Sequence, residues 1–308
     1  MKVVKKFLPF VVLGCLVYFM ATRVDWPATT LALKSIPIGV LVGAVALNMI
    51  AAVTLVTVNF SLVAHVSKFR CLARIEGINS RVLGLSTILP TALVAAYKVR
   101  EFQKVLESTS KSLAFFLLVK LSSVLVAISV IFFFGFKGLS VNADIFESTT
   151  FTIALSCVIF AGCLGVFPSI RGRVKDSVAG ILPEKVKNAL SSGASLLGFK
   201  SWGWGVSTQA VAFLLVIAST WLIAFSINGE IPLTALLIGR ATTILALLVP
   251  ISVAGVGARE VSFLAVLPVF GVGASDAITL VLILLLVQWM TGLLGFGYSV
   301  LLSKLAKD

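Results

Sequence analysis

Long apolar runs alternate with short polar stretches along the whole chain, and these runs define the expected architecture. An α-helix needs about 20 apolar residues to cross the roughly 30 Å hydrocarbon core of a bilayer. Runs near or above that length occupy residues 7–21, 36–64, 112–136, 151–168, 205–227 and 277–302. The pattern predicts an all-α polytopic membrane protein with about six full spans, forming one integral membrane domain over residues 1–308.

A shorter apolar run, residues 82–97, does not fit this series. It is long enough for only about 24 Å of helix, and Pro90 interrupts it. Basic residues stand on both sides of it: Arg70, Arg74, Arg81, Lys98, Arg100 and Lys104. Because a full span would place one basic cluster outside, we expect a Pro-broken re-entrant segment that enters and leaves on the cytoplasmic side. An ordinary tilted span is the alternative.

The stretch VPISVAGVGARE, residues 249–260, interrupts a second apolar region, 233–275, with a proline, two glycines and a charged pair. Helix breakers free backbone polar groups, which are tolerated at membrane depth only where they line a protein-enclosed or wet cavity. Arg259 and Glu260 are also costly at that depth unless they are paired or functional. We expect a second Pro-broken re-entrant segment, centred near Pro250.

The two broken segments resemble each other at a constant offset. Arg81 and Glu101 are separated by the same number of residues as Arg240 and Glu260. When shifted by this offset of 159 residues, the neighbouring apolar runs of the first half overlap those of the second half. We therefore expect sub-repeats at about 36–136 and 205–302, joined by a cytoplasmic linker at 171–200. The charge pattern gives them opposite orientations, which is the inverted repeat common in secondary transporters.

Composition supports a membrane protein and excludes a soluble domain. The chain is 59% hydrophobic and 12% charged, with a mean hydropathy of +1.12, whereas soluble domains are about 25% charged. A net charge of +13 suggests nucleic acid in a soluble protein, but here the basic residues lie in short loops, where they orient the spans. We expect no nucleic-acid partner, a location in the plasma (inner) membrane, and both termini in the cytoplasm.

Cations near the broken segments are the candidate chemistry. Arginine binds phosphate through paired hydrogen bonds, and lysine offers a point charge. The predicted substrate-binding residues are Lys98, Arg100, Lys120, Arg240, Arg259 and Glu260. We expect them to converge on one polar cavity that binds an anionic lipid; snorkelling of single cations to the interface is the alternative.

The sequence offers no basis for an enzyme. It contains no metal-ligand cluster, no Ser-His-Asp arrangement, no carboxylate pair at catalytic spacing and no Walker A motif. We therefore expect no enzyme activity, no catalytic residue, no metal and no cofactor.

The stretch PISVAGVGARE resembles the P-x-S-P-G-G-x-G-x-R-E signature of the lysylphosphatidylglycerol synthase transmembrane-region family, also called flippase-like. The matching positions are Pro250, Ser252, Gly255, Gly257, Arg259 and Glu260. The first broken segment is similar to a P-x-x-x-G-[DE]-x-x-R pattern of the family, in which Pro90 matches and Lys98 replaces the arginine. Where the family shows E-R-x-x-D in the next span, Lys120 takes the arginine position and Ser123 the aspartate position.

The resemblance implies a function in lipid transport. In this family the region is associated with moving charged lipids between leaflets, and some members carry a soluble aminoacyl-transfer domain after it; we expect a stand-alone member here. The expected function is a flippase for an anionic lipid or a lipid-linked envelope precursor. The alternative is a non-catalytic membrane subunit of an envelope lipid or polysaccharide assembly complex, with the 171–200 linker binding a protein partner.

Overall fold

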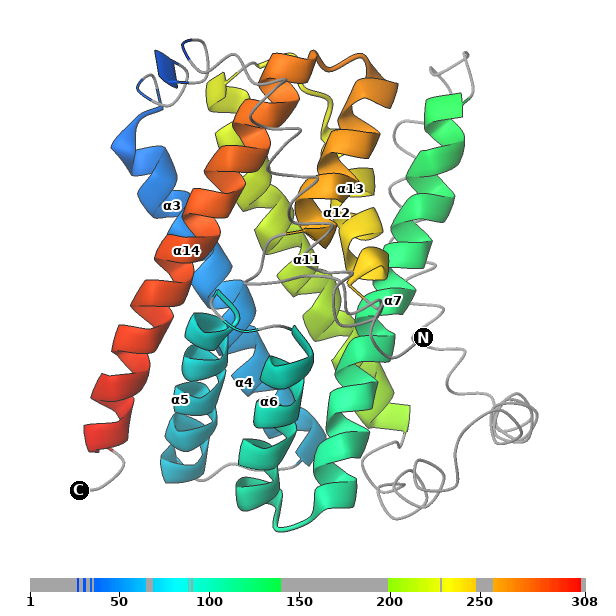
Figure 1. Ribbon diagram of the computed structural model, residues 1–308. Helices are drawn as coiled ribbons and strands as arrows, with labels where there is room; N and C mark the ends of the chain where they lie inside the picture. Colours follow the sequence, from blue (N-terminus) through cyan, green and yellow to red (C-terminus); the bar gives the residue numbers. More distant parts are fainter. Residues whose placement is uncertain are drawn as a thin grey trace, which may run out of the picture.

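The chain forms helices throughout the part that its structure, a computed structural model, describes (Figure 1). The described residues are 36–64, 69–87, 91–139, 199–227, 229–247 and 257–305, with Pro27, Thr30, Leu31, Lys34 and Leu89. The helices are α3 (Ile38–Met49), the π-helix η1 (Ile50–Thr54), α4 (Leu55–Ala64), α5 (Phe69–Leu85), α6 (Thr91–Leu106), α7 (Thr109–Leu139), α11 (Phe199–Ile227), α12 (Leu233–Ala246), α13 (Ala258–Val266), the 3-10 helix η2 (Leu267–Phe270) and α14 (Ala274–Leu305).

Four stretches of helix in the described part are long and apolar enough to cross a membrane. They are Ile38–Leu62, Thr109–Gly135, Ser201–Ile227 and Ala274–Ser303, of 25 to 30 residues. Each corresponds to a predicted span, so the expected all-α polytopic fold is confirmed. The predicted spans at 7–21 and 151–168, and the predicted linker except its last two residues, lie outside the described residues.

The order of helices is the same in the two halves. A long span (α3–η1–α4, and later α11) is followed by two short helices and then by a second long span (α7, and later α14). Shifting α7 by 159 residues gives 268–298, which overlaps α14. The short helices α5 and α6 lie at one end of the molecule, and α12 and α13 lie at the other (Figure 1). This arrangement agrees with an inverted repeat, which stays a prediction.

The first broken segment is a pair of helices longer than the sequence indicated. Arg70 and Arg74, which polarity placed in a loop, belong to α5. The break follows Leu85, where the hydroxyl groups of Ser86 and Thr87 donate to backbone oxygens three residues earlier, at 2.6 and 2.7 Å. These hydroxyls hydrogen-bond carbonyls of the last turn. Pro90 lies outside the described residues.

Glycines allow α5 to lie directly against α14. A Cβ atom on Gly84 would lie 2.8 Å from Cβ of Phe296, and one on Gly295 would lie 3.0 Å from the carbonyl oxygen of Ser80. A Cβ atom on Gly292 would likewise collide with the side chain of Thr87. Since Gly292 stands near the middle of α14, the end of α5 reaches the middle of that span and not its far end.

The second broken segment comprises α12 and α13. Gly239 lets α12 approach α13, because a Cβ atom there would lie 2.9 Å from the ring of Phe263. Gly257 begins α13 with φ 130°, a backbone conformation that favours glycine. Three residues of the predicted motif, Pro250, Ser252 and Gly255, lie outside the described residues.

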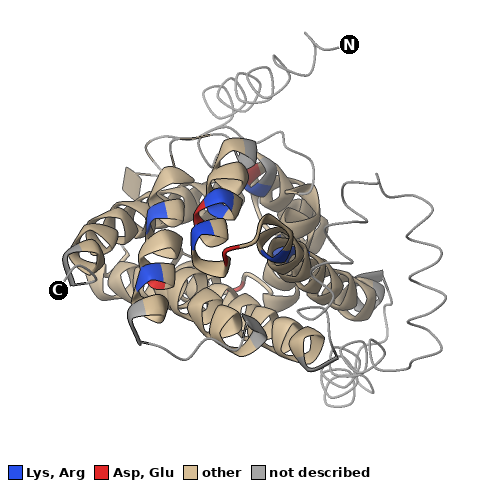
Figure 2. Ribbon diagram, turned by 90° about the horizontal axis from the view of Figure 1, so that it is seen from below, with Lys and Arg blue, Asp and Glu red and all other residues tan. Residues whose placement is uncertain are grey.

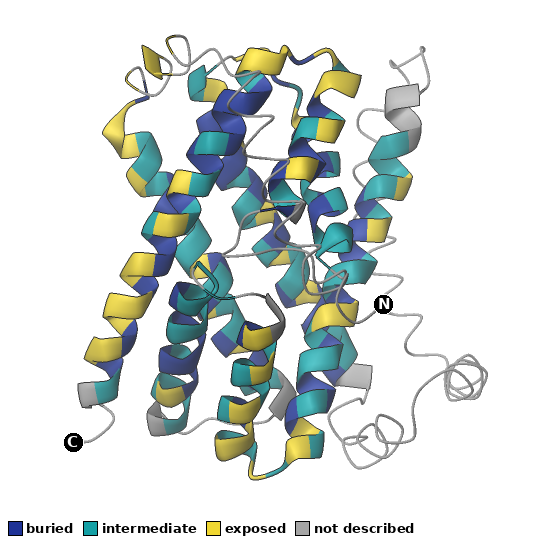
Figure 3. Cartoon of the chain, viewed as in Figure 1, coloured by how far each residue is buried: buried dark blue, intermediate teal, exposed yellow. Residues whose placement is uncertain are grey.

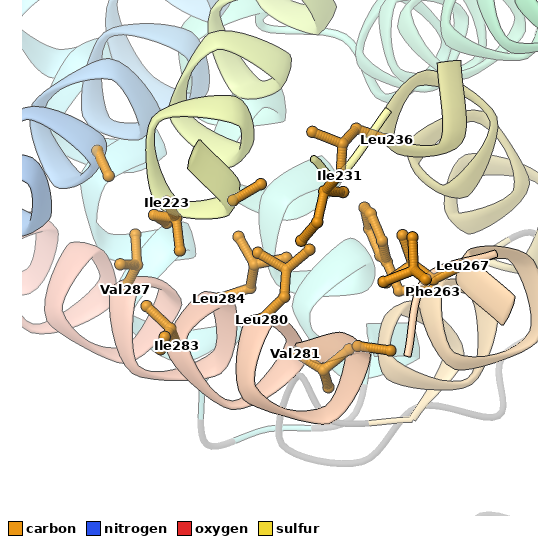
Figure 4. Close-up of a cluster of buried hydrophobic side chains, with 14 of the residues drawn as sticks. Ile223, Ile231, Leu236, Phe263, Leu267, Leu280, Val281, Ile283, Leu284 and Val287 are labelled. Carbon is orange, nitrogen blue, oxygen red and sulfur yellow. The ribbon is translucent and has the colours of Figure 1, made fainter. Parts of the chain in front are cut away.

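Apolar side chains hold the bundle together and also cover its outside. Phe263, Leu280 and Ile283 are buried where the second-half helices meet (Figure 4), and the Phe60 ring packs 4.9 Å from that of Phe115 in the first half. Exposed positions follow the outer faces of the helices (Figure 3), where Leu293 is 72% exposed. Apolar side chains on the outer surface are expected for helices that face lipid.

Candidate functional site

A cavity of about 370 Å³ lies where the two pairs of short helices meet the long spans. It is lined from the first half by α3, η1, α4, α7 and the end of α5, and from the second half by α11, α12, α13 and α14. The volume falls within the usual range for small-ligand sites, roughly 300–1,000 Å³. The cavity is therefore formed jointly by both halves of the chain.

The ionisable residues that line the cavity in the described part of the chain are all basic. They are Lys120 of α7, Arg240 of α12 and Arg259 of α13, and no Asp or Glu occurs among the described lining residues. Arg240 and Arg259 are close enough for their like charges to interact. A cavity with this lining attracts anions and repels cations.

Glu260 fixes the position of Arg259. Nε and Nη2 of Arg259 donate to Oε1 of Glu260 at 3.2 and 3.1 Å. The other carboxylate oxygen, Oε2, accepts the backbone N–H of Gly257 at 2.6 Å. Glu260 is 1% exposed and stands in the first turn of α13. Its carboxylate therefore does two things at once: it accepts a hydrogen bond from a backbone N–H at the helix start, and it compensates the charge of one arginine.

Arg240 has no such charged partner among the described residues. Its Nε is buried, and no group among the described residues accepts a hydrogen bond from it. A buried donor left without an acceptor costs about 1–3 kcal/mol. Neighbouring Gly239 brings α12 against Phe263 and so places the guanidinium at the cavity beside α13.

Lys120 faces the cavity from α7 together with polar groups. Ser123 stands one turn further along the same helix face. Ser123 Oγ lies 2.9 Å from Oε1 of Gln209 on α11, and both residues line the cavity. A cation and an uncharged hydrogen-bonding pair therefore share one wall.

The remaining predicted cations lie elsewhere. Lys98 does not line the cavity; its Nζ lies 5.4 Å from the centre of the Phe102 ring, and its charge interacts with that of Lys120. Arg100 is exposed on α6. Its neighbour Glu101 pairs with Lys104 at 2.5 Å. The structure thus brings three of the five predicted cations together and leaves Lys98 near them and Arg100 apart.

Sequence reasoning missed the uncharged polar residues of the cavity. They are Asn48, Ser86, Ser123, Gln209, Thr220, Gln288 and Thr291. The available signal was their position inside apolar runs, since polar side chains within spans face protein or cavities rather than lipid. The π-helix η1 is a second such signal, because π-helical turns occur often at functional sites, and Ala51 and Ala52 of this turn line the cavity.

These groups are suited to binding an anion. Three basic side chains and several uncharged donors and acceptors converge on one space. Within the described ranges, no group of three His, Cys, Asp or Glu residues could hold a metal ion.

Comparison with known proteins adds one finding. The sequence model of the lysylphosphatidylglycerol synthase transmembrane region matches residues 6–295. No curated protein and no solved structure gives a significant match.

Proposed function

Because the chain belongs to the lysylphosphatidylglycerol synthase transmembrane-region family, we propose that it is a flippase that moves a lipid with an anionic head group, or a lipid-linked envelope precursor, between leaflets. The matched region is the non-catalytic, flippase-like part of the family. The chain is a multi-pass membrane protein, so a lipid substrate has direct access to it from the bilayer.

The observation that carries the proposal is the charge of the cavity. Lys120, Arg240 and Arg259 share one lining without a carboxylate among the described residues that form it. Of these three cations, only Arg259 has a charged partner among the described residues. Bringing an anionic head group into this space offsets the repulsion between the cations and supplies an acceptor for the buried Nε of Arg240.

The two broken segments give a route for the head group. The end of α5 and the start of α13 both reach the cavity, and their helix pairs lie at opposite ends of the molecule (Figure 1). In our proposal the head group enters past one pair and leaves past the other, while the acyl chains stay in lipid. Broken helices near the midplane of a repeat fold are common places for substrate sites.

We place the α5–α6 end in the cytoplasm and the protein in the plasma membrane. Figure 2, viewed from this end, shows the basic positions on an otherwise mostly uncharged bundle. Basic residues on α5, α6 and the start of α7 include Arg74, Lys104 and Lys111, whereas Glu230 and Asp276 are charged residues of the opposite end. The positive-inside rule then puts the α5–α6 end in the cytoplasm. Both chain termini are proposed to lie on that side as well.

Transport in reconstituted vesicles tests the proposal. Purified protein is placed in phosphatidylcholine vesicles containing a trace of fluorescent phosphatidylglycerol or fluorescent phosphatidylcholine, and a membrane-impermeant quencher reports movement between leaflets. We expect phosphatidylglycerol to move at least about tenfold faster than phosphatidylcholine, the effect of one charge-assisted hydrogen bond. Lys120→Gln should remove most of this preference, and Lys111→Gln, on the same helix but outside the cavity lining, should not. Equal rates for both lipids would refute anionic selectivity.

A further inference from the structure

Helix α13 and the short η2 that follows it are bounded at both ends by glycines with a positive φ angle. Gly257 precedes α13 with φ 130°, and Gly271 ends η2 with φ 77°. Among the described glycines, these two alone have positive φ. Glycine adopts more backbone conformations than any other residue, and residues at element ends that absorb such changes form hinges. The α13–η2 segment, residues 258–270, therefore lies between two positions suited to be hinges.

The main contacts of the α13–η2 segment lie within its own half of the chain. It packs against α12 and α14, whereas other helix pairs, such as α5 with α14 and α7 with α12, join the two halves. Its outer side carries exposed Val261 and Val269. A movement of this segment therefore leaves the interface between the halves intact.

One contact holds the segment against α12 beside the cavity. A Cβ atom on Gly239 would lie 2.9 Å from the ring of Phe263, so the ring rests directly on the backbone of α12. Phe263 is buried and lines the cavity. This contact closes the space between α12 and α13 at the cavity wall.

Like charges lie on both sides of this contact. Arg240 directly follows Gly239 on α12. Arg259 lies four residues, about one helical turn, before Phe263 on α13. Both arginines line the cavity, and their charges interact. Because the repulsion acts between α12 and α13, it opposes the contact that holds the two helices together.

The charge on α13 is connected to the first hinge. The carboxylate of Glu260 accepts hydrogen bonds from the Arg259 guanidinium and from the backbone N–H of Gly257. The cavity cation and the hinge residue thus share one buried partner. A force on the guanidinium is therefore transmitted to the residue about which the segment can turn.

An anion between the two arginines reverses the sign of this force. It attracts both guanidinium groups, and arginine binds phosphate oxygens through paired hydrogen bonds. It also supplies an acceptor for the buried Nε of Arg240, which has none among the described residues. Anion binding therefore stabilises the contact between α12 and α13 that the bare charges oppose.

The helix at the corresponding place in the first half, α6, differs in this respect. It also packs on neighbours of its own half, α5 and α7. Its Arg100 is exposed and does not line the cavity, and its Glu101 pairs with Lys104. An anion in the cavity therefore acts on α13–η2 and not directly on α6.

We propose that the α13–η2 segment is a gate that opens and closes the cavity at the end formed by α12 and α13. The segment turns about Gly257 and Gly271 and moves away from α12 when the gate opens. An anion that bridges Arg240 and Arg259 holds the gate closed. This inference rests on the proposed function for the identity of the anion, which is the phosphate of a lipid head group.

Spin labels at two exposed positions test the gate in a protein without its four native cysteines. Labels at Val269 of η2 and Leu233 of α12 are close when these helices are in contact, and they separate when the segment turns away. Labels at Leu233 and at Phe225 of α11 are the control pair, because neither belongs to the segment. We expect phosphatidylglycerol in phosphatidylcholine nanodiscs to raise the ratio of close to separated labels at least about fivefold, the effect of satisfying one buried donor. The control pair should not change.

Two pairs of variants assign the effect to the gate. Arg240→Gln removes the repulsion, so the labels should be close without phosphatidylglycerol and should not respond to it. Arg74→Gln, at an exposed position that does not line the cavity, should behave as the wild type. Gly239→Ala should push Phe263 off α12 and separate the labels in both lipids, whereas Gly203→Ala, with nothing within 4 Å of the added methyl group, should not. If Gly239→Ala does not fold, the two arginine variants still decide.

The outcomes separate this inference from the proposed function. Labels that stay close in every lipid and variant would overturn the gate, and selective phosphatidylglycerol transport in the vesicle assay would then still support a flippase. An equal response to phosphatidylglycerol in the wild type and Arg240→Gln would also overturn the gate, because the anion would then act elsewhere. A response as predicted, with equal transport of phosphatidylglycerol and phosphatidylcholine, would support the gate and refute the flippase.

Inorganic phosphate distinguishes a lipid from a soluble ligand. In phosphatidylcholine nanodiscs without phosphatidylglycerol, millimolar phosphate should leave the labels separated. Closure by phosphate alone would overturn the lipid head group as the ligand that controls the gate.

Discussion

The carboxylate of Glu260 accepts two hydrogen bonds from Arg259, its direct neighbour in the sequence, at 3.1 and 3.2 Å. Adjacent side chains on a helix normally point in different directions. They meet here because α13 has only just begun and Glu260 turns back to the N–H of Gly257 at the helix start. Arg259 is thereby held at the cavity by a residue that does not line it.

The first prediction concerns the buried carboxylate. Glu260→Ala removes the acceptor for Gly257 and leaves Arg259 without its partner, so the free energy of unfolding should fall by about 1–3 kcal/mol. Glu101→Ala is the matched control, because Glu101 follows an arginine in the same way but pairs with half-exposed Lys104; its effect should be about 0–1 kcal/mol. Thermal unfolding in detergent measures both variants. Equal losses would refute a special role for Glu260.

The second prediction concerns the backbone at Gly257. Alanine there must adopt φ 130°, a conformation costing about 1–3 kcal/mol for residues other than glycine. Gly257→Ala should therefore lower the unfolding temperature. Gly297→Ala, inside α14 with no atom within 4 Å of the added methyl group, should raise it slightly, because alanine favours helix over glycine by roughly 0.5–1 kcal/mol. The two variants should thus move the unfolding temperature in opposite directions, and a change of the same sign in both would contradict this explanation.

The architecture was predictable where the length and polarity of the apolar runs determine it. Four of the predicted spans are helices, and most of their ends lie within three residues of the expected limits. The length of the helix pair α5–α6 was underestimated because its outer turns are amphipathic rather than apolar. Ile75 and Ile78 are buried, whereas Arg74 is exposed on the same helix, and an apolar-run criterion does not detect such a helix.

The site was predictable only in part, because sequence does not say which face of a helix meets the cavity. Arg100-Glu101 and Arg259-Glu260 are the same dipeptide in different structural surroundings. Glu260 stands in the first turn of α13, where a free N–H is available, whereas Glu101 lies well inside α6 and has Lys104 one turn ahead. The uncharged cavity residues such as Gln209 became evident only once α7 and α11 were placed side by side.

The third prediction concerns the topology of α5 and α6. Since the end of α5 reaches only the middle of α14, both outer ends of the pair should face the same compartment. In a protein without its four native cysteines, single cysteines at exposed Arg74 and Lys104 should react with an impermeant reagent from the same side of the membrane. A cysteine at exposed Glu230 should react from the opposite side. Labelling of positions 74 and 104 from different sides would make the segment an ordinary span.

We propose that the cavity between the two halves binds an anionic head group, and the lipid that the purified protein retains provides a sharp test of this proposal. Lipids bound in mild detergent are identified and counted by mass spectrometry for the wild type and two double variants. Lys120→Gln with Arg240→Gln removes two charges from the cavity, whereas Lys111→Gln with Arg74→Gln removes one lysine and one arginine at exposed positions that do not line the cavity. We predict that the wild type and the exposed-site variant retain an anionic lipid and that the cavity variant loses at least about nine-tenths of it. Equal retention by both variants, or a wild type that carries no anionic lipid, would show that the cavity does not bind an anionic head group.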